Sequence, residues 1–365
     1  MTDANPSWTP AGHVPDSLEL DTATAAIASS LNLPAGFGLV AQDPDLGPAV
    51  STALARVEKQ LRVAIAHSDP LADATSRHLV EAGGKRVRPL LTILASQLGK
   101  GPVAEVLQAA VVVELTHLAT LYHDDVMDSA PYRRGAPTAH EVWGNQVAIL
   151  AGDLIFARAS ILVSELGPEA VLIQARTFER LVLGQLQETV GPRDGEDPVE
   201  HYLSVIGGKT GSLIATAGQL GAMFAGAGQD VVDVMVEYGE RVGVAFQLAD
   251  DVIDVTGLKA KSGKAPGTDL REGVPTLPVL LLRKAAAAGD ASAAAVLELV
   301  DADLTSDEAL AKAVEALREH PVTQQSWDTA REWADAAKAA LDPLPESTIK
   351  FALAAFAEAV VDRDV

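Results

Sequence analysis

The chain has 365 residues, of which 48 % are hydrophobic and only 4 % aromatic, and its 50 acidic and 28 basic residues give a formal net charge of −22. A charge of this sign and size repels nucleic acid, so we expect no nucleic-acid partner and a soluble cytoplasmic protein. The absence of cysteine excludes a disulfide framework and a thiolate site. No uninterrupted apolar run is long enough to span a membrane, and long Ala-, Leu- and Val-rich segments without turn residues predict an all-α protein.

The N-terminal residues 1–46 are rich in Pro, Asp, Ala and Ser and show no sustained hydrophobic period. This composition predicts a flexible acidic arm. The first helix is expected to run through residues 50–67. No linker or shift in composition divides residues 47–365, so we predict one large helical domain there.

A basic loop follows at residues 83–89, where two glycines precede Lys85, Arg86 and Arg88. The glycines are expected to end one helix, and Pro89 suits the first turn of the next, apolar helix. The three basic residues would then crowd a helix N-terminus, which already favours an anion. A solvated basic loop and a diphosphate site are both compatible with this pattern.

The next stretch, residues 121–140, carries the chemistry most clearly. Asp124, Asp125 and Asp128 come at the end of an apolar segment, and Arg133 and Arg134 follow a short break. Helical spacing predicts that the three carboxylates converge on an oxygen-rich patch, which suits Mg²⁺. Arginine forks match the oxygens of a diphosphate. The pattern therefore indicates a site where metal and arginine bind one anion.

Acidic runs of this kind are often only a solvated helix face, but two observations favour a functional site. The preceding residues 109–123 are almost entirely apolar, so an acidic cluster at their end would lie at the mouth of the core. A second copy of the spacing, Asp250, Asp251 and Asp254, also ends an apolar segment. Two such runs with basic residues between them indicate a pair of facing metal sites.

Other polar groups stand in apolar surroundings. His117 precedes Asp124 by two helical turns and is predicted to face the same way, although a satisfied core histidine is the alternative. Lys209 and Thr210 are the groups suited to phosphate in the Gly- and Ala-rich segment 205–228, where a surface lysine is the alternative. The Gly- and Lys-rich residues 256–278 are predicted to form a lid.

Taken in order, the motifs GGKRVRP, DDVMD followed by RRG, GGKT and FQLADDVID resemble those of the trans-isoprenyl diphosphate synthases, the polyprenyl synthetase family. The resemblance spans roughly residues 47–280. It implies an all-α bundle around a deep central cavity, usually in a homodimer. It also implies condensation of an allylic diphosphate head-to-tail with isopentenyl diphosphate.

The resemblance also assigns residues. It implies Mg²⁺, three ions per active site, held by Asp124, Asp125, Asp128, Asp250, Asp251 and Asp254. The isopentenyl diphosphate contacts would be Lys85, Arg88, His117 and Arg134. The allylic diphosphate contacts would be Arg133, Lys209, Thr210, Gln247 and Lys264. The catalytic set would be Asp124, Asp125, Asp128, Lys209, Asp250 and Asp251. Many members have a lysine where this chain has Val274, which puts one allylic contact in doubt.

Product length is predicted from the helix before Asp124, because a growing tail must run along it away from the metal. The residues four, five and eight positions upstream are all small: Thr120, Ala119 and Thr116. Tyr122 should be rotated off this face. We therefore expect an all-trans product of C30 to C50, a quinone side-chain precursor, released through transient contact with a membrane surface. The alternative is a C20 product, with Phe156 or Leu154 as the floor.

Two other functions remain open from the sequence alone. A terpene cyclase also carries an acidic run, but its second metal motif usually mixes Asn, Ser or Thr with Glu. A non-catalytic subunit of a heteromeric prenyl synthase would share the fold, but such subunits commonly lack intact aspartate motifs. Both runs are intact here, so the sequence favours the enzyme.

Overall fold

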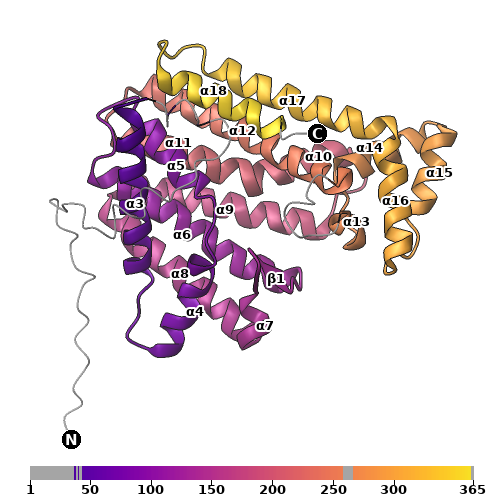
Figure 1. The fold of residues 1–365 in the computed structure, drawn as a ribbon, viewed down its shortest axis with the longest axis horizontal. Helices are drawn as coiled ribbons and strands as arrows, with labels where there is room; N and C mark the ends of the chain where they lie inside the picture. The colour runs from indigo at the N-terminus through magenta and orange to yellow at the C-terminus, as the bar shows by residue number, and fades with distance from the viewer. Residues whose placement is uncertain (1–36, 38–39, 41–42, 258–265, 363–365) are drawn as a thin grey trace, which may run out of the picture.

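The computed structural model describes Phe37, Val40 and residues 43–257 and 266–362. Their regular structure is helical except for one antiparallel hairpin of strands β1 (Tyr132–Arg133) and β2 (Ala136–Pro137). Figure 1 shows long helices gathered into one bundle, with a group of shorter helices at one end. The predicted all-α fold is therefore confirmed.

Helices up to the middle of the chain are α3 (Leu46–Ala64), α4 (Pro70–Glu81), α5 (Val87–Ser96), α6 (Ala104–Met127), α7 (Ala139–Trp143), α8 (Asn145–Glu165) and α9 (Pro168–Val190). Those that follow are α10 (Pro198–Ile206), a π-helical turn η1 (Gly207–Gly211), α11 (Ser212–Phe224), α12 (Gln229–Thr256) and α13 (Thr268–Arg271). The C-terminal helices are α14 (Leu277–Ala287), α15 (Ala291–Val300), α16 (Asp307–Glu319), α17 (Pro321–Ala340) and α18 (Thr348–Val361).

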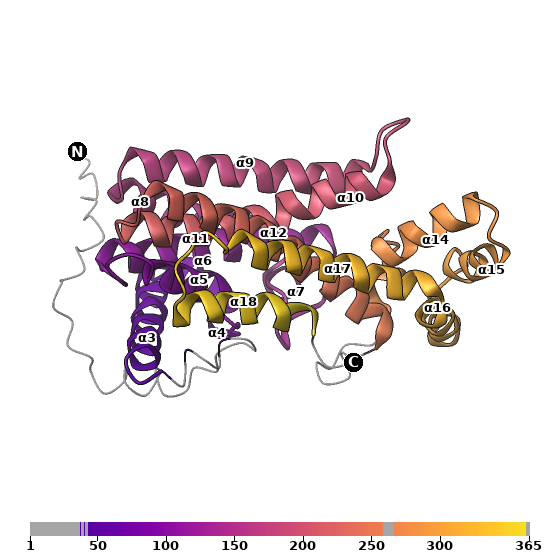
Figure 2. The ribbon, with the colours of Figure 1, turned by 90° about the horizontal axis from the view of Figure 1, so that it is seen from above.

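Helices α6, α11 and α12 form the centre of the bundle. Helix α11 packs against α5, α6, α9 and α12, while α6 also packs against α8, and α12 against α17 and α18. Figure 2 shows α9 along one edge of the bundle, away from α17 and α18. The two helices that carry the aspartate motifs are thus core helices, held apart by α11.

Local sequence explains where the helices near the motifs begin and end. Two glycines with positive φ, Gly83 (86°) and Gly84 (145°), break the chain between α4 and α5. The polar segment 191–197 separates α9 from α10, and the Asp197 side chain caps α10 by accepting a hydrogen bond from the Val199 amide at 2.8 Å. The break at Gly83 and Gly84 agrees with the sequence prediction.

The folded part includes residues on the N-terminal side of the predicted boundary at residue 47. Phe37 and Val40 are fully buried, and the Phe37 ring stacks on Phe356 with centroids 4.6 Å apart. The other end of the domain has a second apolar cluster, formed mainly by α14, α15 and α16.

Two helices, α6 and α8, are long and apolar enough to cross a membrane on length and composition alone. Two thirds of the most apolar window of α6 is buried inside the protein, as expected of a core helix, but only one third of that of α8 is. Helix α8 therefore keeps an apolar face that the described residues do not cover.

Candidate active site

The first aspartate motif lies at the C-terminal end of α6. Asp125 is buried, with 1 % of its surface exposed, and Arg133 on β1 donates to its carboxylate at 2.6 Å. Asp124 is half-buried, and Asp128, which follows the last helical residue, is exposed. The predicted convergence of three carboxylates is thus corrected: Asp125 lies about 100° around the helix from Asp124 and is held inward by Arg133.

The ionised form of the Asp124 carboxyl group is disfavoured by its surroundings. The pKa of this carboxyl group is raised to about 6, chiefly by burial; the charges of Asp128 and Glu188 add to this shift, and those of Lys209 and Arg133 oppose it. The pKa of Asp128 is also raised, by its own desolvation and by Glu188. A bound cation would relieve both carboxylates.

The second motif lies near the C-terminal end of α12. Asp251 is buried, and its carboxylate accepts hydrogen bonds from the Tyr202 hydroxyl on α10 and from Gln247 Nε2 at 2.9 Å. Burial raises the pKa of Asp251 to about 7, even though these two hydrogen bonds lower it. The Thr210 hydroxyl donates to Gln247 Oε1 at 3.1 Å, so two predicted allylic contacts are linked to this aspartate.

The other aspartates of this motif differ in their surroundings. Asp250 is half-buried. Asp254 is buried, and its carboxylate accepts a hydrogen bond from the Asp269 amide at 3.0 Å while its carbonyl accepts one from Gly267 at 2.9 Å. Asp254 therefore anchors the chain that follows residues 258–265. The predicted contact Lys264 lies outside the described residues.

Lys209 lies near the first motif and pairs with a glutamate that influences both motifs. It lies in η1, a π-helical turn of the kind often found at functional sites, and forms an ion pair with Glu188 of α9. The Glu188 charge raises the pKa of Asp124 on one side and that of Tyr202, the partner of Asp251, on the other. Glu188 therefore lies within electrostatic reach of both motifs, and its ion-pair partner Lys209 within reach of the first.

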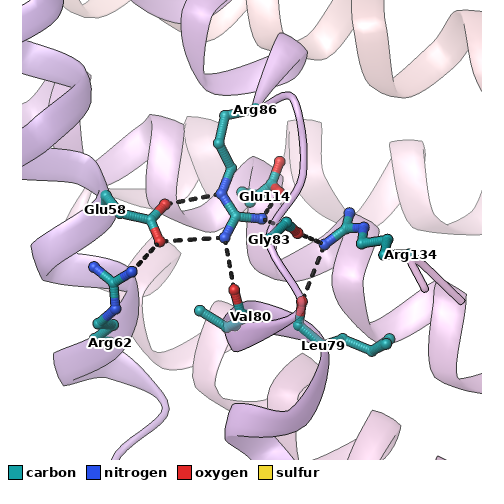
Figure 3. A network of polar contacts seen from close by, with 8 residues as sticks. All are labelled: Glu58, Arg62, Leu79, Val80, Gly83, Arg86, Glu114 and Arg134. Carbon is teal, nitrogen blue, oxygen red and sulfur yellow. Dashed lines mark hydrogen bonds and ion pairs between the residues drawn. The ribbon is translucent and has the colours of Figure 1, made fainter. Parts of the chain in front are cut away.

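The basic side of the site lies at the α4–α5 loop and β1 (Figure 3). The Arg134 guanidinium donates to the carbonyl oxygens of Leu79, at 3.1 Å, and Gly83. Arg88 is half-buried, its Nε has no hydrogen-bond partner among the described residues, and burial lowers its pKa to about 10. Burial, followed by the charges of Arg88 and Arg134, lowers the pKa of His117 well below its usual range, so its imidazole is neutral.

Four polar residues around the site were not predicted from the sequence: Glu58, Glu114, Glu188 and Tyr202. Arg86, which the sequence placed with Lys85 and Arg88 as a candidate anion contact, is instead buried and paired with Glu58 and Glu114. Glu114 could have been found, since it is an isolated acid within the apolar run of α6 and lies three residues before His117. Tyr202 could not, because its partner Asp251 is 49 residues away. His123, next to Asp124 in the chain, lies against α8, where its Nε2 is 3.2 Å from the Ile149 carbonyl oxygen.

The predicted chain-length residues are small and lie on α6 as expected. Thr116 and Ala119 are each 1 % exposed, while Thr120 is half-buried and donates its hydroxyl to the His117 carbonyl. The Tyr122 hydroxyl donates to the Thr75 carbonyl of α4 at 2.5 Å. The Tyr122 side chain is therefore directed toward α4.

Among the described residues, no three His, Asp or Glu side chains form a preassembled metal centre. The donor set nevertheless fits a hard divalent cation, because the half-buried Asp124 and the exposed Asp128 offer carboxylate oxygens at one helix end. Mg²⁺ usually takes only one or two protein carboxylates and completes its coordination with substrate phosphates and water. Both motifs suit a cation that binds together with a diphosphate.

Comparison with known proteins decides the family. The family model described as polyprenyl synthetase matches residues 69–317. The chain belongs to this family. The nonaprenyl diphosphate synthase of Mycobacterium tuberculosis is 46 % identical over 325 residues, which cover 87 % of this chain and 96 % of that protein.

Solved structures of polyprenyl synthetase relatives agree with the fold. A geranylgeranyl pyrophosphate synthase from Corynebacterium glutamicum, complexed with calcium and isoprenyl diphosphate, is 44 % identical and superposes with a TM-score of 0.78, covering 88 % of this chain and 98 % of that one. A decaprenyl diphosphate synthase from Rhodobacter capsulatus is 33 % identical, with a TM-score of 0.78 and coverage of 90 % and 99 %. Divalent metal is thus bound with an isoprenyl diphosphate in this family.

Proposed function

We propose that this prenyltransferase condenses isopentenyl diphosphate head-to-tail with an allylic diphosphate to make an all-trans polyprenyl diphosphate of C30 to C50. The observation that carries the proposal is the pair of aspartate motifs ending two core helices, with Glu188, the ion-pair partner of Lys209, within electrostatic reach of both. The predicted isopentenyl diphosphate contacts Lys85, Arg88, His117 and Arg134 would form the second anion site.

In the reaction, the allylic C–O bond breaks and the diphosphate leaves with the electron pair. The isopentenyl double bond then attacks the allylic carbon, and transfer of a proton from the resulting cation to the released diphosphate restores an alkene. Bound Mg²⁺, three ions in our proposal, would neutralise the growing charge on the leaving diphosphate. Lys209 and Arg133 would add cationic donors to the same leaving group. The buried carboxylates of Asp125 and Asp251 would orient Arg133 and Gln247 rather than contact the metal.

The neutral state of His117 fits an anion site that already holds arginines. A neutral imidazole can donate one hydrogen bond to a diphosphate oxygen without adding a further positive charge beside Arg88 and Arg134. Exclusion of water would come from the apolar bundle and from the predicted lid over residues 256–278, since water would quench the carbocation.

Small side chains along α6 support the long product. Thr116, Ala119 and Thr120 are small side chains at the three predicted positions of α6 before Asp124. The Tyr122 hydroxyl is hydrogen-bonded to α4. A nonaprenyl synthase and a decaprenyl synthase are among the relatives. One added isoprene unit extends the tail by about one helical turn, or ~5 Å.

A C20 product is the second candidate. Phe156 of α8 packs on Phe178 of α9 with ring centroids 3.9 Å apart, and such a pair could form a floor. The similar Corynebacterium glutamicum enzyme is a geranylgeranyl pyrophosphate synthase. The product length of this chain separates the two candidates.

We further propose a cytoplasmic homodimer that contacts a membrane surface only transiently, during product release. Exposed apolar residues on α8 and α9 support the dimer, because a second copy would cover them. They include Ile149, Leu150, Leu172, Val182, Leu183 and Leu186.

The test is an assay of purified protein with Mg²⁺, labelled isopentenyl diphosphate and an allylic primer. We expect labelled prenyl diphosphate, which chelation with EDTA abolishes and added Mg²⁺ restores. Release of an olefin from the allylic diphosphate alone would instead indicate a terpene cyclase. Absence of any product under these conditions would contradict the proposal and favour a non-catalytic subunit.

A further inference from the structure

A single buried arginine lies at the centre of the basic side of the site. Arg86 is 7 % exposed, and its Nε donates to Glu58 at 2.8 Å while its two terminal nitrogens donate to Glu114 at 2.8 Å and to Glu58 again at 3.3 Å. The same nitrogens also donate to the carbonyl oxygens of Val80 and Gly83, at 3.1 and 3.4 Å. All five N–H groups of the guanidinium are therefore used inside the protein (Figure 3).

The backbone at this residue is strained. Arg86 has φ 47° and ψ 37°, a left-handed conformation that disfavours side chains with a Cβ. It follows Gly83 and Gly84, which also have positive φ. The turn sets the direction in which α5 begins, so it decides where Lys85 and Arg88 point. The hydrogen bonds of the Arg86 side chain hold this turn in place from within the protein.

Glu114 interacts with the arginines of the anion site in addition to its ion pair with Arg86. It is only 2 % exposed, and its charge opposes the burial that lowers the pKa of Arg88 and Arg134 and contributes to the raised pKa of Arg86. Three guanidinium groups close together would otherwise repel one another and lose their hydration. The buried carboxylate of Glu114 therefore stabilises these three positive charges in the absence of substrate.

We propose that Arg86, clamped between Glu58 of α3 and Glu114 of α6, is the positioning residue of the isopentenyl diphosphate site. It contacts no substrate, because its donors are all occupied by the protein. It acts by fixing the turn that presents Lys85 and Arg88 to the diphosphate. This inference rests on the proposed function, in which Lys85 and Arg88 contact isopentenyl diphosphate.

A purely structural role predicts something different. Arg86 joins the α4–α5 loop to α3 and α6, so its loss could simply destabilise the fold. That effect would lower the melting temperature and the fraction of active enzyme, and would not distinguish one substrate from the other. A positioning role predicts a higher KM for isopentenyl diphosphate with an unchanged KM for the allylic substrate.

The experiment compares two variants at temperatures well below their melting transitions. Arg86→Lys keeps the buried charge but can make at most three of the five hydrogen bonds. Arg86→Gly keeps the left-handed turn and removes every bond of the side chain. We expect KM for isopentenyl diphosphate to rise about 10-fold in Arg86→Lys and further in Arg86→Gly. The KM of the allylic primer should change less than about two-fold.

Arg62→Gln is the matched control. Arg62 also pairs with Glu58, at 2.9 Å, but its side chain is 41 % exposed and does not reach Glu114 or the α4–α5 turn. This variant should keep the wild-type KM for both substrates. Equal changes in both KM values, or loss of stability alone, would overturn the inference for Arg86. Failure of both Arg86 variants to fold would also overturn the inference, because Arg86 would then be required for folding itself.

Lys85→Ala, measured in parallel, separates this inference from the proposed function. If Lys85→Ala raises KM for isopentenyl diphosphate and the Arg86 variants do not, only the positioning role fails. If Lys85→Ala leaves this KM unchanged, the assignment of the anion site itself is wrong.

Discussion

Among single residues, Asp124 and Asp250, which lie on different core helices, are the proposed anchors for the metal. We predict that Asp124→Ala or Asp250→Ala lowers kcat about 100- to 1,000-fold, because each removes an anchor for the metal that neutralises the leaving diphosphate. Steady-state kinetics with Mg²⁺ and circular dichroism would measure activity and fold together. Asp303→Ala changes an exposed aspartate outside the site and should remain fully active. Near-normal turnover in either site variant would contradict the assignment of that aspartate as a metal ligand.

The raised pKa of Asp251 gives a prediction about pH. With a folded-state pKa of about 7, above its ordinary value near 4, the folded protein holds a proton that the unfolded chain has lost between these pH values. This group therefore lowers the stability of the metal-free protein as pH rises from about 4 to 7. Asp251→Asn should raise the melting temperature by a few degrees at pH 8 in EDTA, while abolishing activity.

Near pH 4 the Asp251→Asn and wild-type proteins should melt within about a degree of each other, because the carboxyl group is then protonated in the folded state and largely protonated in the unfolded chain. Differential scanning calorimetry across this pH range measures the effect. A variant less stable than wild type at pH 8 would show that the buried carboxylate is well stabilised by Tyr202 and Gln247, contrary to our interpretation.

At the scale of elements, the sequence predicted helix ends better than side-chain directions. The glycines at 83 and 84 end a helix as expected, because backbone conformation and turn chemistry are local. The burial of Asp125 was not predicted, since it depends on Arg133 from the following hairpin. The π-helical turn at Lys209 also escaped prediction. It is packed closely by Gly184 of α9, where a Cβ would come within 3.1 Å of the Lys209 side chain.

The buried network around Arg86 shows why much of the site could not be predicted. Its hydrogen bonds to Glu58 and Glu114 join residues 28 positions apart on either side. Nothing in local periodicity indicates such a pairing. The motifs located the site, whereas the packing of α3, α4 and α6 determines which of its charged groups are available to a substrate.

Helix α6 carries the prediction about product length. A phenylalanine introduced one or two turns before Asp124 should block the growing tail, so Thr120→Phe is expected to shorten the product by at least two isoprene units. Ala119→Phe should shorten it too, but at a greater cost in stability, because Ala119 is fully buried while Thr120 is half-buried. Mass spectrometry of the extracted products measures both.

Tyr122→Phe is the control for this series. It removes the hydrogen bond to the Thr75 carbonyl, at a cost of about 1 kcal/mol, without adding bulk along α6. Product length should not change. An unchanged distribution in both phenylalanine variants at 119 and 120 would show that the floor lies elsewhere, and Phe156 would be the next residue to replace.

At the scale of the whole molecule, α8 and α9 leave an apolar face that a second copy would cover. Leu150 of α8 is 65 % exposed, and Leu150→Glu should convert a dimer into monomers, because it introduces a charge into the interface. Light scattering coupled to gel filtration measures the mass. Leu299→Glu, at a 40 % exposed leucine of α15, should leave the dimer intact. A wild-type monomer at micromolar concentration would contradict the proposed dimer.

The length of the product made by the wild-type protein is the most informative single measurement of its function. Purified enzyme, Mg²⁺, an excess of labelled isopentenyl diphosphate and a C15 allylic primer would be incubated to completion, and the dephosphorylated products sized by chromatography and mass spectrometry. We predict a narrow distribution of all-trans products between C30 and C50. A product that stops at C20 would contradict the assignment of α6 as an open path for the chain.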